Sequence, residues 1–208
     1  MAVSPKLEVE QGLWAHAPCV IGMDEVGRGA LAGPVSVGAL ALGADCGPWP
    51  EHLRDSKTMT PLRRAATAPH VRAWGVSAVG HASNEEIDRL GLTVALGLAG
   101  RRALVGLHAA GIDVPSSAIL LDGTFDWLAP ALRAPLRTTL RAKADRDCAS
   151  VSGAALVAKV ERDDRMVEAD AQHPGYGWAS NKGYGSAAHM SAIATLGPSA
   201  LHRQTWLH

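Results

Sequence analysis

The sequence lacks the marks of a disulfide-rich, zinc-binding or membrane-spanning protein. Its cysteines are few, odd in number and widely spaced (Cys19, Cys46 and Cys148), and no C-x-x-C pair occurs, which disfavours a disulfide framework and a zinc ribbon. Nine histidines are present without an H-x-x-x-H pair, so a helical zinc site is also disfavoured. No apolar run approaches the roughly 20 residues of a membrane span, and the N-terminus has no secretory-signal pattern. We therefore expect a protein of the reducing cytoplasm that does not enter a membrane.

Aromatic residues and net charge are scarce as well. Aromatic side chains make up 4% of the chain and the formal net charge is zero, so nothing draws the whole molecule towards nucleic acid or a membrane surface. Any site for a polyanion must therefore be a local patch. The 208 residues and 47% hydrophobic content suit a single folded domain with a real core. We expect that domain to act as a monomer, and no protein partner is evident.

The first half of the chain predicts a strand meander. Residues 20–23 (VIGM) and 35–42 (VSVGALAL) have the apolar patterns of short strands, and the short connection between them favours an antiparallel hairpin. Residues 74–80 (WGVSAVG) predict a third strand.

The second half predicts alternating helices and strands. A capping-box spacing at Ser83 and Glu86 begins a helix that should continue to about Leu107. Residues 118–121 predict a buried strand, and helices are expected over 153–171 and 186–196. Residues 136–143 fit either a helix or a strand, and the two threonines and the brevity of the segment favour a strand. The whole order indicates an α/β protein with a mixed sheet.

Acidic residues follow several predicted strands. Asp24 and Glu25 come after the first strand, Asp122 after the strand at 118–121, and Asp145 after the segment at 136–143. Neighbouring strand ends lie close in space, and four carboxylates gathered there would repel one another unless cations shared them. Magnesium or manganese suits such oxygen ligands. Taken singly, each acid is more simply explained as a solvated loop charge.

The stretch Gly27-Arg28-Gly29 also allows two interpretations. The glycines could serve only a tight turn, or their missing side chains could let the backbone approach a sugar or phosphate beside Arg28. The spacing is not the G-x-G-x-x-G of a dinucleotide fold. Elsewhere, Ser56 and Lys57 lie in a predicted loop, Tyr184 lies between two glycines where it could stack on a sugar or base, and basic residues cluster between Arg133 and Arg146.

Taken in order, these segments resemble bacterial ribonuclease HII. The resemblance rests on GMDEVGRGALAGPV, LRDSKTMT, LLDG, KADRDCASVSGAALVAKVERDDRM, NKGYGSAAH and LGPSALHR, and it spans about residues 20–206. It implies a ribonuclease H-like fold, with a five-stranded mixed sheet flanked by helices. It also implies one domain over residues 1–208, with a catalytic core at about 18–170 and a C-terminal helical segment at about 171–208 that helps to clamp the duplex.

The resemblance assigns roles to particular residues. It implies that Asp24, Glu25, Asp122 and Asp145 are catalytic and hold two Mg²⁺ or Mn²⁺ ions, with Asp147 and Asp163 as the competing carboxylates. It implies that Gly27, Arg28 and Gly29 bind substrate and that Tyr184 senses the junction between RNA and DNA. The further candidate substrate contacts are Ser56, Lys57, Lys143, Lys159, Arg162 and Lys182. A serine usual in the family is replaced by Ala155, which leaves a hydroxyl missing near these contacts.

The implied activity is endonucleolytic cleavage of RNA in RNA/DNA hybrids and at single ribonucleotides in duplex DNA. Three alternatives remain open. Ribonuclease HIII shares the fold but normally has a sizeable domain before the first carboxylates, and few residues precede Asp24 here. An inert nucleic-acid-binding relative would not need all four carboxylates. A small kinase would need a G-x-x-x-x-G-K-[ST] loop, which the sequence lacks.

Overall fold

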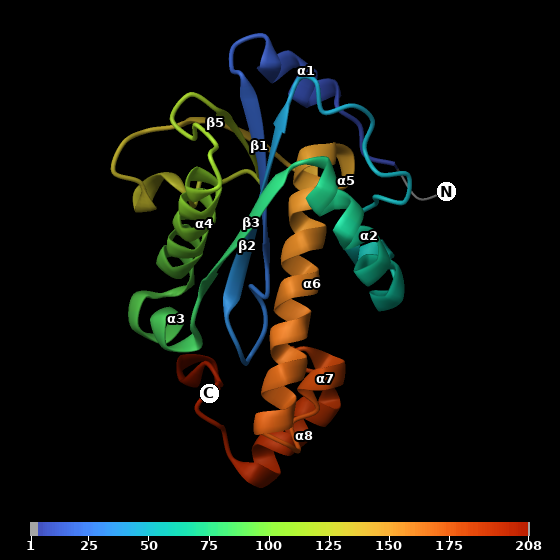
Figure 1. Cartoon of the computed structure of the whole chain (residues 1–208). Helices are drawn as coiled ribbons and strands as arrows, with labels where there is room; N and C mark the ends of the chain where they lie inside the picture. The colour runs from blue at the N-terminus through green and yellow to red at the C-terminus, as the bar shows by residue number, and fades with distance from the viewer. Residues whose placement is uncertain (1–3, 208) are drawn as a thin grey trace.

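A single mixed sheet of five strands organises the molecule (Figure 1). The structure is a computed structural model that describes residues 4–207. Its strands are β1 (Cys19–Val26), β2 (Val35–Gly43), β3 (Val76–Ala82), β4 (Ala118–Asp122) and β5 (Arg137–Arg141), in the spatial order β3-β2-β1-β4-β5. β1 and β3 pair antiparallel with β2, whereas β4 pairs parallel with β1 and β5. The predicted meander, the strand at 136–143 and the α/β class are confirmed.

Helices cover both faces of this sheet. They are α1 (Glu8–Trp14), α2 (Pro61–Trp74), α3 (Asn84–Leu90), α4 (Leu92–Ala109), α5 (Ala144–Asp147), α6 (Ala149–Gln172), α7 (Trp178–Asn181) and α8 (Ala187–Leu196). α4 packs on one face and the long α6 runs along the other (Figure 1). Buried side chains such as Ile21 and Leu104 fill the first layer, and Leu40 and Leu156 fill the second. No helix within residues 4–207 is long and apolar enough to cross a membrane.

One predicted helix is divided in two. The single helix expected from Ser83 to about Leu107 is wrong, because Gly91 has a φ of 78° and separates α3 from α4. Positive φ is a conformation that glycine adopts readily and that a right-handed helix does not contain. The capping box itself is confirmed, since the Ser83 and Glu86 side chains each accept a hydrogen bond from the other's backbone N–H. Helix α6 begins four residues before its predicted start, at Ala149.

The C-terminal segment returns to the connection between β1 and β2. α7 and α8 lie beside the far end of α6 (Figure 1). Isolated β-bridges then join Ala30 to Tyr184 and Ala32 to His202. Residues that are far apart in sequence therefore meet directly after the strand that carries Asp24 and Glu25.

Candidate active site

The four predicted carboxylates lie at one edge of the sheet, and we call Asp24, Glu25, Asp122 and Asp145 the carboxylate edge. β1 and β4 run parallel, with Met23 opposite Leu121, so the next residues, Asp24 and Asp122, come at the same end of both strands. Asp145 belongs to the short α5 that follows β5. Asp24 and Glu25 lie inside β1 rather than after it, because β1 continues to Val26 in its pairing with β2. Their side chains consequently point to opposite faces of the sheet.

Mutual repulsion and burial mark this edge. The Asp24 side chain is buried, and burial, together with the charges of Glu25, Asp122 and Asp145, raises its pKa well above the ordinary range. Burial and the charge of Asp145 raise the pKa of Asp122 as well. Both effects disfavour the ionised form. The negative charges of the four acids at the carboxylate edge are therefore not fully balanced by positive charges nearby.

The positive charge present comes from flexible side chains. The Lys57 Nζ lies 2.6 Å from Asp145 Oδ2, with the lysine side chain 72% exposed, and Arg28 Nη1 lies 3.4 Å from Glu25 Oε1. Asp122 Oδ1 instead accepts the Ala144 backbone N–H at 2.6 Å. With these partners engaged, no three Asp, Glu, His or Cys side chains of residues 4–207 converge closely enough to hold one ion. The four oxygen-bearing side chains nevertheless have the donor chemistry that magnesium and manganese prefer.

The two competing carboxylates are each neutralised by their own arginine or lysine. Asp147 pairs with Arg146 at 2.6 Å, which lowers its pKa. Asp163 accepts from Lys159 at 2.5 Å and from Arg64 at 3.4 Å. Neither acid is among the charges that raise the pKa of Asp24. Asp145 differs from both in this respect, because its charge is one of those that raise the pKa of Asp24.

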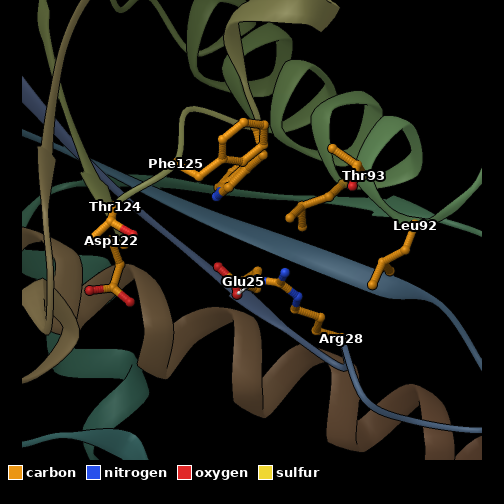
Figure 2. A pocket seen from close by; sticks show the side chains of 10 residues that line it. Glu25, Arg28, Leu92, Thr93, Asp122, Thr124 and Phe125 are labelled. Atoms are coloured by element: carbon orange, nitrogen blue, oxygen red, sulfur yellow. Dashed lines mark hydrogen bonds and ion pairs between the residues drawn. The ribbon is translucent and has the colours of Figure 1, made fainter.

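A cavity of about 310 Å³ opens beside the carboxylate edge. Figure 2 shows Glu25, Arg28 and Asp122 on one side of it and Phe125, Thr93 and Leu92 on the other. The Phe125 ring is 62% exposed, so an apolar surface lies next to the charged groups. A phosphodiester held at the carboxylates would thus have room for an attached sugar or base.

Gly27, Arg28 and Gly29 form a turn that we call the 27–29 loop. The Ala30 N–H donates to the Gly27 carbonyl at 3.3 Å, which closes the turn. The Gly27 N–H donates to the Tyr184 hydroxyl at 3.2 Å, across 157 positions of sequence. The structure therefore brings together the two features that sequence reasoning could only connect through a family resemblance.

The two glycines of this loop differ in whether the fold requires glycine at their position. Gly27 has a φ of 82°, and a Cβ built on it would overlap the Arg162 guanidinium. Gly29 has no positive φ, and a Cβ there would meet no atom within 4 Å. The fold thus requires glycine at position 27 but leaves position 29 open.

Arg162 is a support rather than an exposed contact for substrate. Its side chain is fully buried, and its guanidinium donates to the carbonyls of Ala32, Lys182 and Pro34 at 3.2, 3.0 and 2.9 Å. It also lies 5.4 Å from the centre of the Tyr184 ring. The predicted substrate contact is therefore corrected, because a side chain without exposed surface cannot meet a duplex.

The other predicted substrate contacts lie around the same face. Lys143 is exposed and has a left-handed backbone, with a φ of 62°. Lys159 is largely buried against Asp163 and lies 6.0 Å from the Tyr184 ring centre, and the Lys182 ammonium donates to the Ala179 carbonyl. Ser56 is buried in a short helical turn, and its backbone carbonyl accepts a hydrogen bond from Arg64 at 3.1 Å. Ala155 is also buried.

Two histidines to which sequence reasoning gave no role form a chain of contacts behind Tyr184, in which His189 contacts Tyr184 and His202 contacts His189. His189 Nδ1 lies 2.9 Å from the Tyr184 carbonyl, so it carries a proton, and its Nε2 accepts from Trp178 Nε1 at 3.0 Å. His202 Nδ1 accepts the Ser199 backbone N–H at 2.9 Å, which places its proton on Nε2, 3.1 Å from His189 Nε2. These tautomers follow from partners that can only donate or only accept.

Comparison with known proteins places the chain among ribonucleases. A family model described as Ribonuclease HII matches residues 21–208. A ribonuclease HII of Streptomyces avermitilis is 44% identical over 207 residues, covering 98% of this chain and 84% of that protein. One from Cereibacter sphaeroides is 44% identical over 188 residues, covering 90% of this chain and 84% of that protein.

Solved structures agree on the fold. The ribonuclease H2 of Pyrococcus horikoshii superposes with a TM-score of 0.68 at 23% identity, covering 90% of this chain and 93% of that one. The ribonuclease HII of Archaeoglobus fulgidus, solved in complex with PCNA, gives 0.70 at 22% identity with the same coverage. A Bst ribonuclease HIII solved with Mn²⁺ gives 0.66 at 22% identity, covering 93% of this chain and 67% of that one. These likenesses show the ribonuclease H-like fold.

Proposed function

The chain belongs to the ribonuclease HII family, and from that membership we propose a specific activity for it. The enzyme hydrolyses the RNA strand of RNA/DNA hybrids and cuts on the 5′ side of a single ribonucleotide embedded in duplex DNA. The products carry a 3′-hydroxyl and a 5′-phosphate. In the cell this activity serves ribonucleotide excision repair and removal of RNA primers, in the cytoplasm, where free cysteines such as these three are favoured.

The observation that carries the proposal is the junction of the carboxylate edge with the 27–29 loop. Half of the carboxylate edge is continuous with the loop, since β1 supplies Asp24 and Glu25 and runs directly into the turn. A group that can select a ribonucleotide is thereby placed within a few residues of groups that can cut beside it. We propose that the catalytic residues are Asp24, Glu25, Asp122 and Asp145.

We propose Mg²⁺ or Mn²⁺ as the cofactor, with two ions held by the carboxylate edge. The fit rests on the buried Asp24 among three further acids and on the exposed Lys57, whose ammonium can withdraw from Asp145 into solvent. When bound, such ions lower the pKa of an attacking water and stabilise the departing oxygen in phosphodiester cleavage. The carboxylates themselves supply the oxygen ligands and fix where the phosphodiester must lie.

Selection falls to the 27–29 loop and Tyr184. The ribose 2′-hydroxyl is the local group that distinguishes RNA from DNA on the cut strand, and the backbone of the exposed residues Arg28 and Gly29 can hydrogen-bond to it. The Tyr184 ring, held by its hydroxyl against Gly27, packs on the neighbouring deoxyribose. A ribose at that position would add a hydroxyl against the ring, so the site favours an RNA-to-DNA junction.

The lysines near the site are candidates for contacts with the phosphates of the duplex. Lys57 and Lys143 are exposed beside the carboxylate edge, and Lys159 and Lys182 lie beside Tyr184. We propose that they contact phosphates, which gives binding its salt dependence, while Ser56 positions the turn that carries Lys57. The duplex is bound between the core at about 18–170 and the clamp at about 171–208 of a single domain, and the enzyme acts as a monomer.

A direct test uses labelled duplex DNA that contains one ribonucleotide. With Mg²⁺ the enzyme should cut the labelled strand once, on the 5′ side of the ribonucleotide, and the upstream product should be extendable by a polymerase because it ends in a 3′-hydroxyl. The same duplex with deoxyribose at that position should remain whole. Absence of cleavage with either Mg²⁺ or Mn²⁺, or equal cleavage of the all-DNA duplex, would refute the proposed function.

A further inference from the structure

Arg203 is a buried cation without an acidic partner among residues 4–207. Its side chain has no exposed surface, and it forms no ion pair there. Burial and the nearby charge of Arg162 lower its pKa to about 9, so it still carries its charge near neutral pH. Burying a charge without a counter-ion is strongly unfavourable unless hydrogen bonds replace its hydration. The guanidinium must therefore be stabilised by the polar groups around it.

All of those partners are backbone carbonyls at and beside the 27–29 loop. Nη2 donates to the Gly27 oxygen at 2.6 Å and Nη1 donates to the Arg28 oxygen at 2.9 Å. Nε and Nη2 also donate to the Gly33 oxygen, each at 3.2 Å. The Trp206 ring lies 4.8 Å from the guanidinium carbon, which holds its plane in place. One planar group thus fixes two successive carbonyls of the turn.

Fixing these carbonyls also fixes the amides that follow them. A trans peptide is planar, so its N–H points away from its C=O, and no cis peptide occurs among the described residues. With the Gly27 and Arg28 oxygens directed at Arg203, the Arg28 and Gly29 N–H groups must point away from that guanidinium. Both residues are exposed, and neither N–H has a hydrogen-bond partner within residues 4–207. The loop consequently presents two adjacent free donors.

Arg162 provides an internal contrast. It too is a buried arginine that donates to three carbonyls, two of which belong to Ala32 and Lys182. The amides after these carbonyls are already used, since Gly33 N–H donates to Leu201 and Gly183 N–H to Asn181. The Arg162 contacts therefore complete the fold, whereas those of Arg203 leave donors free for a ligand.

We propose that Arg203 is a positioning residue for ribonucleotide selection: it orients the Arg28 and Gly29 amides as donors to the ribose 2′-hydroxyl. The inference rests on the proposed function, in which the 27–29 loop reads that hydroxyl. The positive charge also polarises the two peptide groups, which strengthens their N–H donors. A lysine would keep the charge but could not hold two carbonyls in one rigid fork.

The test is a ratio of binding affinities without cleavage. Dissociation constants are measured in EDTA for a duplex containing one ribonucleotide and for the matched all-DNA duplex, with wild type and with Arg203→Lys. The wild type should favour the ribonucleotide, and Arg203→Lys should reduce that preference about tenfold, the equivalent of one good hydrogen bond. Affinity for the all-DNA duplex should change little.

Arg102→Lys is the matched control. Arg102 donates to Glu86 and to the His81 carbonyl, so this variant makes the same change of side chain and loses arginine hydrogen bonds away from the loop. Its affinity ratio should equal that of the wild type.

The possible failures are distinguishable. A wild-type ratio of one would remove the proposed function together with this inference. A wild type that discriminates and a folded Arg203→Lys that discriminates equally well would remove the inference alone. If Arg203→Lys does not fold, Trp206→Leu releases the guanidinium from its ring neighbour while sparing its hydrogen bonds. That variant should lower the ratio about threefold, as part of one hydrogen bond is lost, and an unchanged ratio would again overturn the inference.

Discussion

The carboxylate edge and the 27–29 loop are neighbours that are built in opposite ways. The edge collects like charges whose compensation comes from exposed side chains, with Lys57 72% and Arg28 62% exposed. The loop is held by the fully buried Arg203, which donates to the Gly27 and Arg28 carbonyls, and by the Tyr184 hydroxyl. The carboxylate edge has negative charges that are not fully paired. The 27–29 loop has backbone N–H donors that are not paired, but their direction is fixed.

This difference separates chemistry from selection. Groups that need cations to act can remain loosely paired until the cations and substrate arrive. Groups that must tell a ribose from a deoxyribose by one hydroxyl gain from being held in place beforehand, because an ordered donor loses less entropy on binding. We therefore expect substitutions at the carboxylate edge to reduce the rate of cleavage, and substitutions in the 27–29 loop to reduce the preference for a ribonucleotide.

The largest effect is expected at the carboxylate edge. Asp122→Asn should reduce cleavage with Mg²⁺ or Mn²⁺ by about a thousandfold or more, since such catalysis depends strongly on electrostatic stabilisation of the reacting phosphate. The asparagine oxygen can still accept the Ala144 N–H, so the fold should persist. Cleavage rates measure the loss of activity, and thermal melting checks that the fold persists. Turnover at the wild-type rate would contradict the catalytic role of Asp122.

The two loop glycines should separate stability from function. Gly29→Ala should leave the melting temperature nearly unchanged, because a Cβ there meets no atom within 4 Å, yet reduce cleavage at a single ribonucleotide about a hundredfold by blocking close approach, a loss of about 3 kcal/mol. Gly27→Ala should instead destabilise the fold by about 2 kcal/mol or more, through its positive φ and its overlap with Arg162. A strongly destabilised Gly29→Ala, or one with normal activity, would contradict this interpretation of position 29.

Tyr184 should affect one substrate more than the other. Tyr184→Ala removes the ring beside the junction and should reduce single-ribonucleotide cleavage about tenfold more than cleavage of long hybrids, in line with the value of one stacked ring. Tyr184→Phe keeps the ring and loses only the hydroxyl that accepts from Gly27, so its effect should be smaller. Steady-state rates on both substrates provide the comparison. Equal losses on the two would remove the junction role.

The smallest expected effect is on pH-dependent stability, through the histidines behind Tyr184. Burial and the neighbouring His189 lower the pKa of His202 from about 6.5 to about 4. Below pH 6.5 His202 binds a proton in the unfolded chain but not in the folded chain. The contribution of the neutral His202 to the free energy of unfolding is therefore complete above pH 6.5 and is lost as the pH falls towards 4. Between about pH 7.5 and 5.5 the loss should be roughly 1 kcal/mol.

A variant isolates that contribution. The raised pKa values of Asp24 and Asp122 act in the opposite direction, since protonation of those acids relieves repulsion in the folded state. Denaturant unfolding at both pH values should therefore be compared between wild type and His202→Asn. The variant should lose less stability on acidification than the wild type does. An identical loss in the two proteins would show that His202 is not the group responsible.

Much of the fold was predictable because its signals are local. β1, β2 and β4 contain short apolar runs, and α8 (Ala187–Leu196) begins one residue after the predicted start at Ser186 and ends at the predicted Leu196, before Gly197. Helices α1 and α2 were missed for physical reasons. α1 buries Glu10, whose carboxylate accepts from Ser150 at 2.7 Å, and α2 contains Pro69 within its span, so neither shows the expected apolar pattern.

The candidate site divides in the same manner. Asp24, Glu25 and Asp122 were accessible to sequence reasoning because acids at the ends of strands are visible in the sequence itself. Arg203 and His189 were not, because each acts through backbone carbonyls supplied by other parts of the chain. Arg203 stands beside His202 in the sequence with no local sign that it would be buried. Only the folded chain brings it to the 27–29 loop.

The most direct test of the division between chemistry and selection is the binding preference of Asp122→Asn. With Mg²⁺ absent, this variant should bind a duplex with one ribonucleotide more tightly than the all-DNA duplex, by the same ratio as wild type, although it cannot cut when Mg²⁺ is added. That result would place selection in the 27–29 loop and Tyr184, apart from the carboxylates. A ratio that falls to one together with the loss of cleavage would contradict the account.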